Sequence, residues 1–205
     1  MAQAFSMPYN PPMDQPTPTS VYLDNNVWDF LFERKIDLSV ALPRPDFCVC
    51  ITREAEFEIP PIPPDKAELK AFIENTIAKC SVRVDSLFGF YDDSLPPEEQ
   101  RVGGFDVGRW AGAEEIAFIN QQKMPVGTLI KNPKTGLYKH EADISLAARS
   151  FHSVVLSNDK SGPINKAYQQ GGKVVYLTNF DYSGMSLGDF IKAALEQPPD
   201  FGSSS

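Results

Sequence analysis

The sequence predicts an α/β protein, a three-layer α/β/α sandwich around a central, mostly parallel sheet. Three observations support this prediction. Short apolar runs of strand length alternate along the chain with segments of helical periodicity. The 205 residues are enough for one well-buried core, and the 42% hydrophobic and 22% charged residues are typical of an ordinary globular domain. Asp24 ends the first apolar run, at the strand edge where open α/β sheets bind their ligands.

Strand and helix signals alternate from the first apolar run onward. The first expected strand covers residues 21–23, and a helix over 27–34 follows it. Asn25 or Asn26 is placed to cap that helix. The second expected strand covers residues 47–51, and the residues after it begin a helical turn.

The clearest amphipathic helix comes next. Asp65 and Glu68 have the spacing of a capping box in front of its apolar positions, and the helix ends near Cys80. The signals weaken over residues 81–139, which we treat as an insertion carrying one or two helices; residues 87–91 fit either a strand or a loop. The remaining expected elements are helices over 113–122, 140–151, 163–170 and 186–195, and strands over 154–156 and 174–177.

The two ends of the chain differ in composition from the rest. Residues 1–19 are rich in proline and poor in branched aliphatic residues, so we expect a disordered tail there, and residues 196–205 are expected to form a second tail. The domain between them, residues 20–195, has no apolar run near the roughly 20 residues that cross a bilayer. The N-terminus also lacks the pattern of a secretory signal. We therefore expect a cytoplasmic protein with no membrane partner.

Charge and cysteine content narrow the function. The formal net charge of -8 argues against non-specific binding to a polyanion, because Lys and Arg supply most of that affinity. It does not exclude a nucleic-acid enzyme whose site consists of clustered acids, since bound cations reverse the local sign of charge. The three cysteines are expected to be small core hydrophobes rather than a redox or zinc site.

Acidic residues follow several of the expected elements. They are Asp24 after the first strand, Glu54 and Glu56 after the second, Asp143 in the helix over 140–151, and Asp159 after the strand over 154–156. Each alone has a simpler interpretation, as a helix cap, a first-turn acid or a turn residue. Together at one sheet edge, four carboxylates would bind Mg²⁺ or Mn²⁺, hard ions that favour carboxylate and water oxygens.

Four segments in this order resemble the PIN-domain family, which consists largely of metal-dependent ribonucleases. They are Tyr22-Leu23-Asp24-Asn25-Asn26-Val27, an acid after the second strand, Glu141-Ala142-Asp143-Ile144-Ser145-Leu146-Ala147-Ala148, and Val155-Leu156-Ser157-Asn158-Asp159-Lys160. The resemblance covers most of residues 20–180, with the insertion as its weakest part. It implies a PIN-like fold for the domain.

The resemblance also implies a role for each matching position. The metal-binding and catalytic acids would be Asp24, Glu56, Asp143 and Asp159, with Glu54 as the rival of Glu56. Asn26 would steady the loop after the first strand, and Ser157 would orient a phosphate or a water. Arg149 and Lys160 flank the later motifs; they either hold an RNA backbone or belong to a solvated surface.

The implied activity is an endoribonuclease that hydrolyses RNA phosphodiester bonds through a carboxylate-bound Mg²⁺ or Mn²⁺ site. The family further implies the toxin of a toxin–antitoxin pair, an antitoxin protein as partner, and a homodimer. Two alternatives stay open. One is a PIN-like scaffold that binds RNA or protein without cleavage. The other is a phosphohydrolase of the haloacid dehalogenase type, a class that expects a second Asp where this chain has Asn26.

Overall fold

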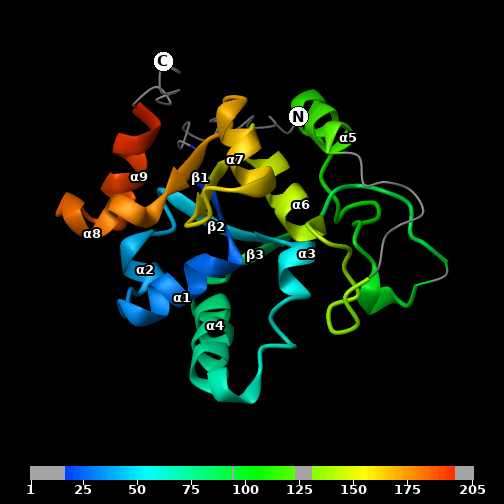
Figure 1. Ribbon diagram of the computed structural model, residues 1–205, viewed down its shortest axis with the longest axis horizontal. Helices are drawn as coiled ribbons and strands as arrows, with labels where there is room; N and C mark the ends of the chain where they lie inside the picture. The colour runs from blue at the N-terminus through cyan, green and yellow to red at the C-terminus, as the bar shows by residue number, and fades with distance from the viewer. Residues whose placement is uncertain (1–16, 94, 123–130, 197–205) are drawn as a thin grey trace, which may run out of the picture.

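A five-stranded parallel sheet forms the centre of the protein (Figure 1). The computed structural model describes residues 17–93, 95–122 and 131–196. The strands are β1 (Thr19–Leu23), β2 (Phe47–Thr52), β3 (Arg83–Asp85), β4 (Val154–Ser157) and β5 (Val174–Tyr176), in the order β3-β2-β1-β4-β5. Every pair of neighbouring strands is parallel. The predicted α/β class is therefore confirmed.

The first strand of the chain lies in the middle of the sheet. Val21 of β1 is in register with Val49 of β2 on one side and with Val154 of β4 on the other. The pairing with β4 continues past the strand end, because the Asp24 N–H donates to the Leu156 carbonyl at 3.0 Å. The strand order reverses between β2 and β4, so the carboxyl end of β1 is at the switch point where ligands of such sheets bind.

Helices cover both faces of the sheet and complete three layers. They are α1 (Asn25–Glu33), α2 (Leu38–Ala41), α3 (Arg53–Glu56), α4 (Ala67–Cys80), α5 (Ala113–Gln121), α6 (Glu141–Arg149), α7 (Gly162–Gln169), α8 (Phe180–Ser183) and α9 (Leu187–Glu196), with 3-10 turns at η1 (Pro64–Lys66), η2 (Pro97–Glu99) and η3 (Leu177–Asn179). On one face, Val21 and Leu23 belong to an apolar cluster that includes residues of α1, α4 and α9. On the other face, Tyr22 belongs to a second cluster with residues of α5, α6 and α7.

Most expected helices and strands are confirmed to within one or two residues, as periodicity predicts them. The expected capping box of α4 is wrong. The N-cap of α4 is Lys66, with no side-chain hydrogen bond, because the η1 turn leads directly into the helix. Residues 87–91, left between strand and loop, form a loop with isolated bridges from Leu87 to Arg109 and from Phe88 to Gly103.

The expected insertion over residues 81–139 contributes to the sheet at its start. β3 lies inside this range and pairs with β2, with Cys50 opposite Arg83. The longer excursion therefore begins after Asp85 and includes α5. The expected tails lie mostly outside the described residues. Within the described part of the chain, no helix combines the length and the apolar character needed to span a membrane.

The cysteines are free thiols. Cys48 and Cys50 lie on one face of β2, as their alternation predicts, with 3.8 Å between their sulfur atoms. Burial raises the pKa of the Cys50 thiol to about 12, so it stays protonated at neutral pH. Cys50 is fully buried, and Cys48 and Cys80 are partly buried. The expectation of a small core hydrophobe is confirmed for Cys50.

Candidate functional site

Asp24 lies at the carboxyl end of the central strand with 8% of its surface exposed. Its main chain begins α1, since its carbonyl accepts from the Val27 N–H at 2.9 Å, but its side chain makes no capping hydrogen bond. The carboxylate is turned instead toward the end of β4. There one oxygen, Oδ2, accepts from the Ser157 hydroxyl at 2.5 Å and from the Asn26 amide at 2.6 Å. The helix-cap interpretation of this side chain is therefore wrong.

Ser157 and Asn26 tie the ends of β1 and β4 together. The Ser157 hydroxyl donates to Asp24 and accepts from the Asp159 N–H at 2.9 Å. The side-chain oxygen of Asn26, Oδ1, accepts from the Asn158 N–H, also at 2.9 Å. These contacts place both predicted orienting residues beside Asp24. They hold the carboxylate in one orientation, because both of its side-chain partners are themselves fixed by the β4 loop.

Asp143, from another segment, acts on Asp24, and both of these acids act on Glu58. Burial raises the pKa of the Asp24 carboxyl; the Ser157 hydrogen bond opposes that shift and the charge of Asp143 adds to it. The pKa of Glu58 is raised by burial first and then by the charges of Asp143 and Asp24. Glu58 also accepts a hydrogen bond from the side chain of Asn25, next to Asp24 in sequence. Asp24, Glu58 and Asp143, which we call the acidic triad, thus share one electrostatic environment.

Glu58 was not among the acids expected from the sequence. It lies beyond the end of α3, past the two glutamates that a search of the helix itself singles out. The sequence feature that could have pointed to Glu58 is its position six residues after Thr52. The Thr52 side chain accepts from the Ala55 N–H at 3.2 Å and so fixes the start of α3. Because α3 ends at Glu56, the chain is turned so that Glu58 faces Asn25 of α1.

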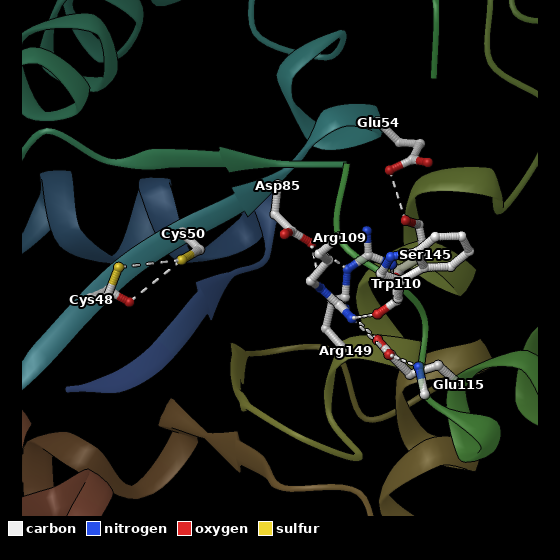
Figure 2. A network of polar contacts seen from close by, with 10 residues as sticks. Cys48, Cys50, Glu54, Asp85, Arg109, Trp110, Glu115, Ser145 and Arg149 are labelled. Atoms are coloured by element: carbon white, nitrogen blue, oxygen red, sulfur yellow. Dashed lines mark hydrogen bonds and ion pairs between the residues drawn. The ribbon is translucent and has the colours of Figure 1, made fainter. Parts of the chain in front are cut away.

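The two expected glutamates are engaged elsewhere. Glu54 accepts from the Ser145 hydroxyl of α6 at 2.7 Å, as Figure 2 shows, and burial raises its pKa while the charge of Arg149 lowers it. Glu56 is paired with Arg53 on the same helix and has 37% of its side chain exposed.

Asp143 and Asp159 occupy the predicted elements in different ways. Asp143 is in the first turn of α6, 41% exposed, with its carboxylate 3.1 Å from His140 Nδ1. The Asp159 carboxylate accepts from the Ser161 N–H at 2.8 Å and from the Ser161 hydroxyl at 2.6 Å. Its main-chain N–H is the contact that joins it to Ser157. Its side chain has the geometry of the turn residue considered for it.

The two expected cations differ in exposure. Lys160 is exposed, 5.6 Å from the centre of the Tyr176 ring. The expectation that Arg149 lies at the surface, on an RNA backbone or in solvent, is wrong. Its side chain lies in the interior with 1% of its surface exposed. Its guanidinium donates to Asp85 at 2.8 Å and to the Ser145 carbonyl at 3.3 Å (Figure 2).

A buried ion-pair network surrounds Arg149. Asp85, at the end of β3, also accepts a hydrogen bond from Arg109 Nε at 3.1 Å. Arg109 is in turn paired with Glu115 of α5 (Figure 2). Glu115 has no exposed surface and also accepts from the Gly112 N–H at 2.8 Å. The network joins β3, the loop after it, α5 and α6. We therefore assign Arg149 to the fold rather than to substrate.

Asp24, Glu58 and Asp143 present carboxylate oxygens, the donors that hard divalent cations prefer, and the Ser157 hydroxyl lies beside Asp24. The charge of Asp143 disfavours ionisation of Asp24 and of Glu58, and a bound cation would relieve that repulsion. Within the residues that the structure describes, no three His, Cys, Asp or Glu side chains converge closely enough to hold one ion directly.

Comparison of the chain with models of protein families, with curated proteins and with solved structures found no match. The function is therefore inferred from the hydrogen bonds and charges around Asp24.

Proposed function

We propose that the protein is a metal-dependent endoribonuclease whose site is the acidic triad, Asp24, Glu58 and Asp143, with Ser157 and Asn26 as orienting residues. One observation carries the proposal. A buried carboxylate at the end of the central strand is fixed by hydrogen bonds from two side chains and carries the repulsion of a second acid. A buried charge of this kind is costly unless it is compensated, and a cation supplied in function would compensate it.

Each residue of this chain has a definite task in such a reaction. Ser157 and Asn26 hold the Asp24 carboxylate in place, so that no side-chain freedom is lost when it engages a ligand. The Asp143 side chain is 41% exposed and is open to solvent, whereas Asp24 is buried. A bound Mg²⁺ or Mn²⁺ supplies a water activated for attack and stabilises charge on the phosphate oxygens.

The experiment measures Mn²⁺ binding by calorimetry and Mn²⁺-dependent cleavage of an unstructured RNA, with EDTA as the metal-free reference. Asp24→Asn and Glu58→Gln are expected to lose both. Glu56→Gln is the matched control, since it changes a nearby glutamate that is paired with Arg53 and should keep both. Full cleavage by Asp24→Asn, or loss of cleavage in Glu56→Gln with Glu58→Gln active, would contradict this assignment of the site.

The toxin role, the antitoxin partner and the homodimer belong to this proposal as its biological setting. They rest on the resemblance of the four sequence segments. A small antitoxin encoded next to this gene, and growth arrest on expression that Asp24→Asn relieves, would support them. Growth unaffected by the wild-type chain would count against a toxin.

A non-catalytic scaffold is the second candidate, and the position of Asp159 favours it. Asp159, expected as the fourth acid, accepts hydrogen bonds from Ser161 instead, so three acids remain where four were expected. RNA retention without Mn²⁺ binding or cleavage would identify the scaffold. The haloacid dehalogenase alternative ranks last, because Asn26 donates to Asp24 where that class needs a second acid. A phosphate ester trapped on Asp24 would revive it.

A further inference from the structure

Four aromatic side chains gather in one patch on the segment that joins β3 to α5, drawn in green in Figure 1. The ring of Phe88, which is half-buried, lies at the centre of the patch. Its centroid is 4.3 Å from that of Trp110, 5.0 Å from that of Phe105 and 6.1 Å from that of Phe90. Phe90 is 84% exposed, and Phe105 and Trp110 are each 75% exposed. We call these four residues the aromatic patch. Contiguous exposed apolar surface of this kind marks an interaction site.

Backbone hydrogen bonds hold the segment that carries the patch. The Phe88 N–H donates to the Arg109 carbonyl at 2.7 Å, and the Gly89 N–H donates to the Gly103 carbonyl at 3.2 Å. The chain also approaches itself closely at Gly103 and Gly108, because a Cβ on Gly103 would lie 2.5 Å from the Gly108 nitrogen. The rings are therefore presented on a braced backbone. A surface prepared in this way loses little conformational freedom when a partner binds.

The segment around the patch is acidic. Residues 86–111 contain five acidic residues, two arginines and no lysine. Both arginines are engaged within the fold, since Arg101 is paired with Glu141 at 2.9 Å and Arg109 is paired with Glu115. The charge that this segment presents to an approaching molecule is therefore mainly negative.

Two exposed acids lie at the rim of the patch. Asp106 directly follows Phe105 in the chain. Tyr91 ring atoms lie 3.5 Å from the place of a Cβ on Gly104, so the chain that leads from Tyr91 to Asp93 runs beside the chain that carries Phe105. Asp93 and Asp106 are both exposed. The surface thus has an apolar centre and a polar rim, which is the anatomy of a protein–protein interface.

We propose that the aromatic patch binds a basic segment of a partner protein. Apolar side chains of that segment contact the rings, and its lysine or arginine side chains contact Asp93 and Asp106. Buried aromatic residues supply most of the binding energy of such interfaces, and complementary charges at the rim select the partner. A cation is also attracted to the face of an aromatic ring. None of these residues belongs to the acidic triad, so the proposal is independent of the ribonuclease function.

Charge distinguishes this partner from three other occupants of the patch. Single-stranded RNA stacks on aromatic rings, but its phosphates need a positively charged groove. A second copy of this chain in a two-fold contact would place the two acidic rims close together. The residues before Thr17, which the structure does not describe, contain no lysine or arginine. A basic segment of another protein is the occupant that matches both the rings and the rim.

Selection from a random dodecapeptide library displayed on phage tests the chemistry of the partner. The library is first depleted on the double variant Phe90→Ser, Phe105→Ser, whose substitutions are at exposed positions. It is then selected on the full wild-type chain. We expect the enriched peptides to carry a net positive charge together with apolar or aromatic residues.

Trp110 emission then measures the affinity of one enriched peptide that contains no tryptophan. The chain has one other tryptophan, Trp28, which is buried and supplies a constant background. The double variant Phe90→Ser, Phe105→Ser should bind about tenfold more weakly or worse. Asp93→Asn combined with Asp106→Asn should weaken binding about two- to fivefold at low salt and less at high salt.

Tyr182→Ser is the matched control, because it removes an exposed aromatic ring from α8, outside the patch, and should leave the affinity unchanged. Circular dichroism checks that each variant is folded. A double variant that is not folded is replaced by the single variant Phe90→Ser, at the most exposed ring of the patch.

Several results would overturn the proposal, whether or not the protein cleaves RNA. They are the absence of enriched peptides, enrichment of neutral or acidic peptides, and equal affinity in wild type and the patch variant. Saturable binding of a labelled oligouridine in EDTA that the patch variant loses would assign the patch to RNA instead. A wild-type dimer in sedimentation that the patch variant dissociates would assign it to a second copy of the chain.

Discussion

Replacing Arg149 with methionine should destabilise the fold substantially, although the residue was expected at an RNA-binding surface. The guanidinium is 1% exposed and donates to Asp85, itself 6% exposed, at 2.8 Å. Removing one partner of a buried ion pair costs about 3–5 kcal/mol, since the other charge stays buried. Here Arg109 still reaches Asp85 at 3.1 Å and compensates in part. We therefore expect a loss of about 3 kcal/mol in the free energy of unfolding.

Urea denaturation followed by circular dichroism measures this loss. Lys79→Met is the control, because Lys79 pairs with Asp37 at the surface, where such a pair contributes about 0–1 kcal/mol. The double variant Arg149→Met, Asp85→Leu also removes the carboxylate, which Arg109 alone compensates only in part, and should be more stable than Arg149→Met alone. A loss below about 1 kcal/mol in Arg149→Met, or a double variant less stable than the single one, would refute the buried-network account.

Three further outcomes follow from the site. Thr52→Ala removes the cap of α3 and should cost about 1 kcal/mol in urea denaturation, with Thr52→Ser close to wild type. Ser157→Ala leaves the buried Asp24 carboxylate short of a donor, and we expect a loss of about 1–3 kcal/mol in the free energy of unfolding. The same replacement should cost less in an Asp24→Asn background, and an equal loss in both backgrounds would argue against this role of Ser157. Because the pKa of Asp24 is raised in the fold, the unfolded chain loses this proton at lower pH, so wild type should lose stability relative to Asp24→Asn as pH rises from the ordinary carboxyl pKa to the raised one. A stability difference between the two proteins that is independent of pH would contradict that shift.

The sequence allowed the central part of the fold to be predicted because the central strands are continuous apolar runs. β1, β2 and β4 are buried on both faces, so their hydrophobicity alone identifies them. β3 escaped prediction for the opposite reason. It is a three-residue edge strand, Arg83–Asp85, with two charged side chains, and it is recognisable only by its pairing with β2.

The site was predictable where a residue sits directly at a strand end. Asp24 and Ser157 lie at the ends of neighbouring strands, so the register of the sheet brings them together independently of the conformation of the loops. Glu58 depends on where a one-turn helix stops, which propensity does not fix to within a residue. Arg149 depends on a carboxylate 64 positions away, and no local pattern shows whether such a charge is buried and paired or exposed.

The central position of β1 has a consequence for synthesis of the chain. The strand made first has its partner β4 near the end of the sequence, and the hydrogen bond that fixes Asp24 spans 133 positions. A nascent or prematurely terminated chain that stops before Ser157 has neither the strand that flanks Asp24 nor its hydroxyl donor. Most of the domain must therefore be synthesised before Asp24 is fixed, and a product truncated before Ser157 lacks the contact that orients this carboxylate.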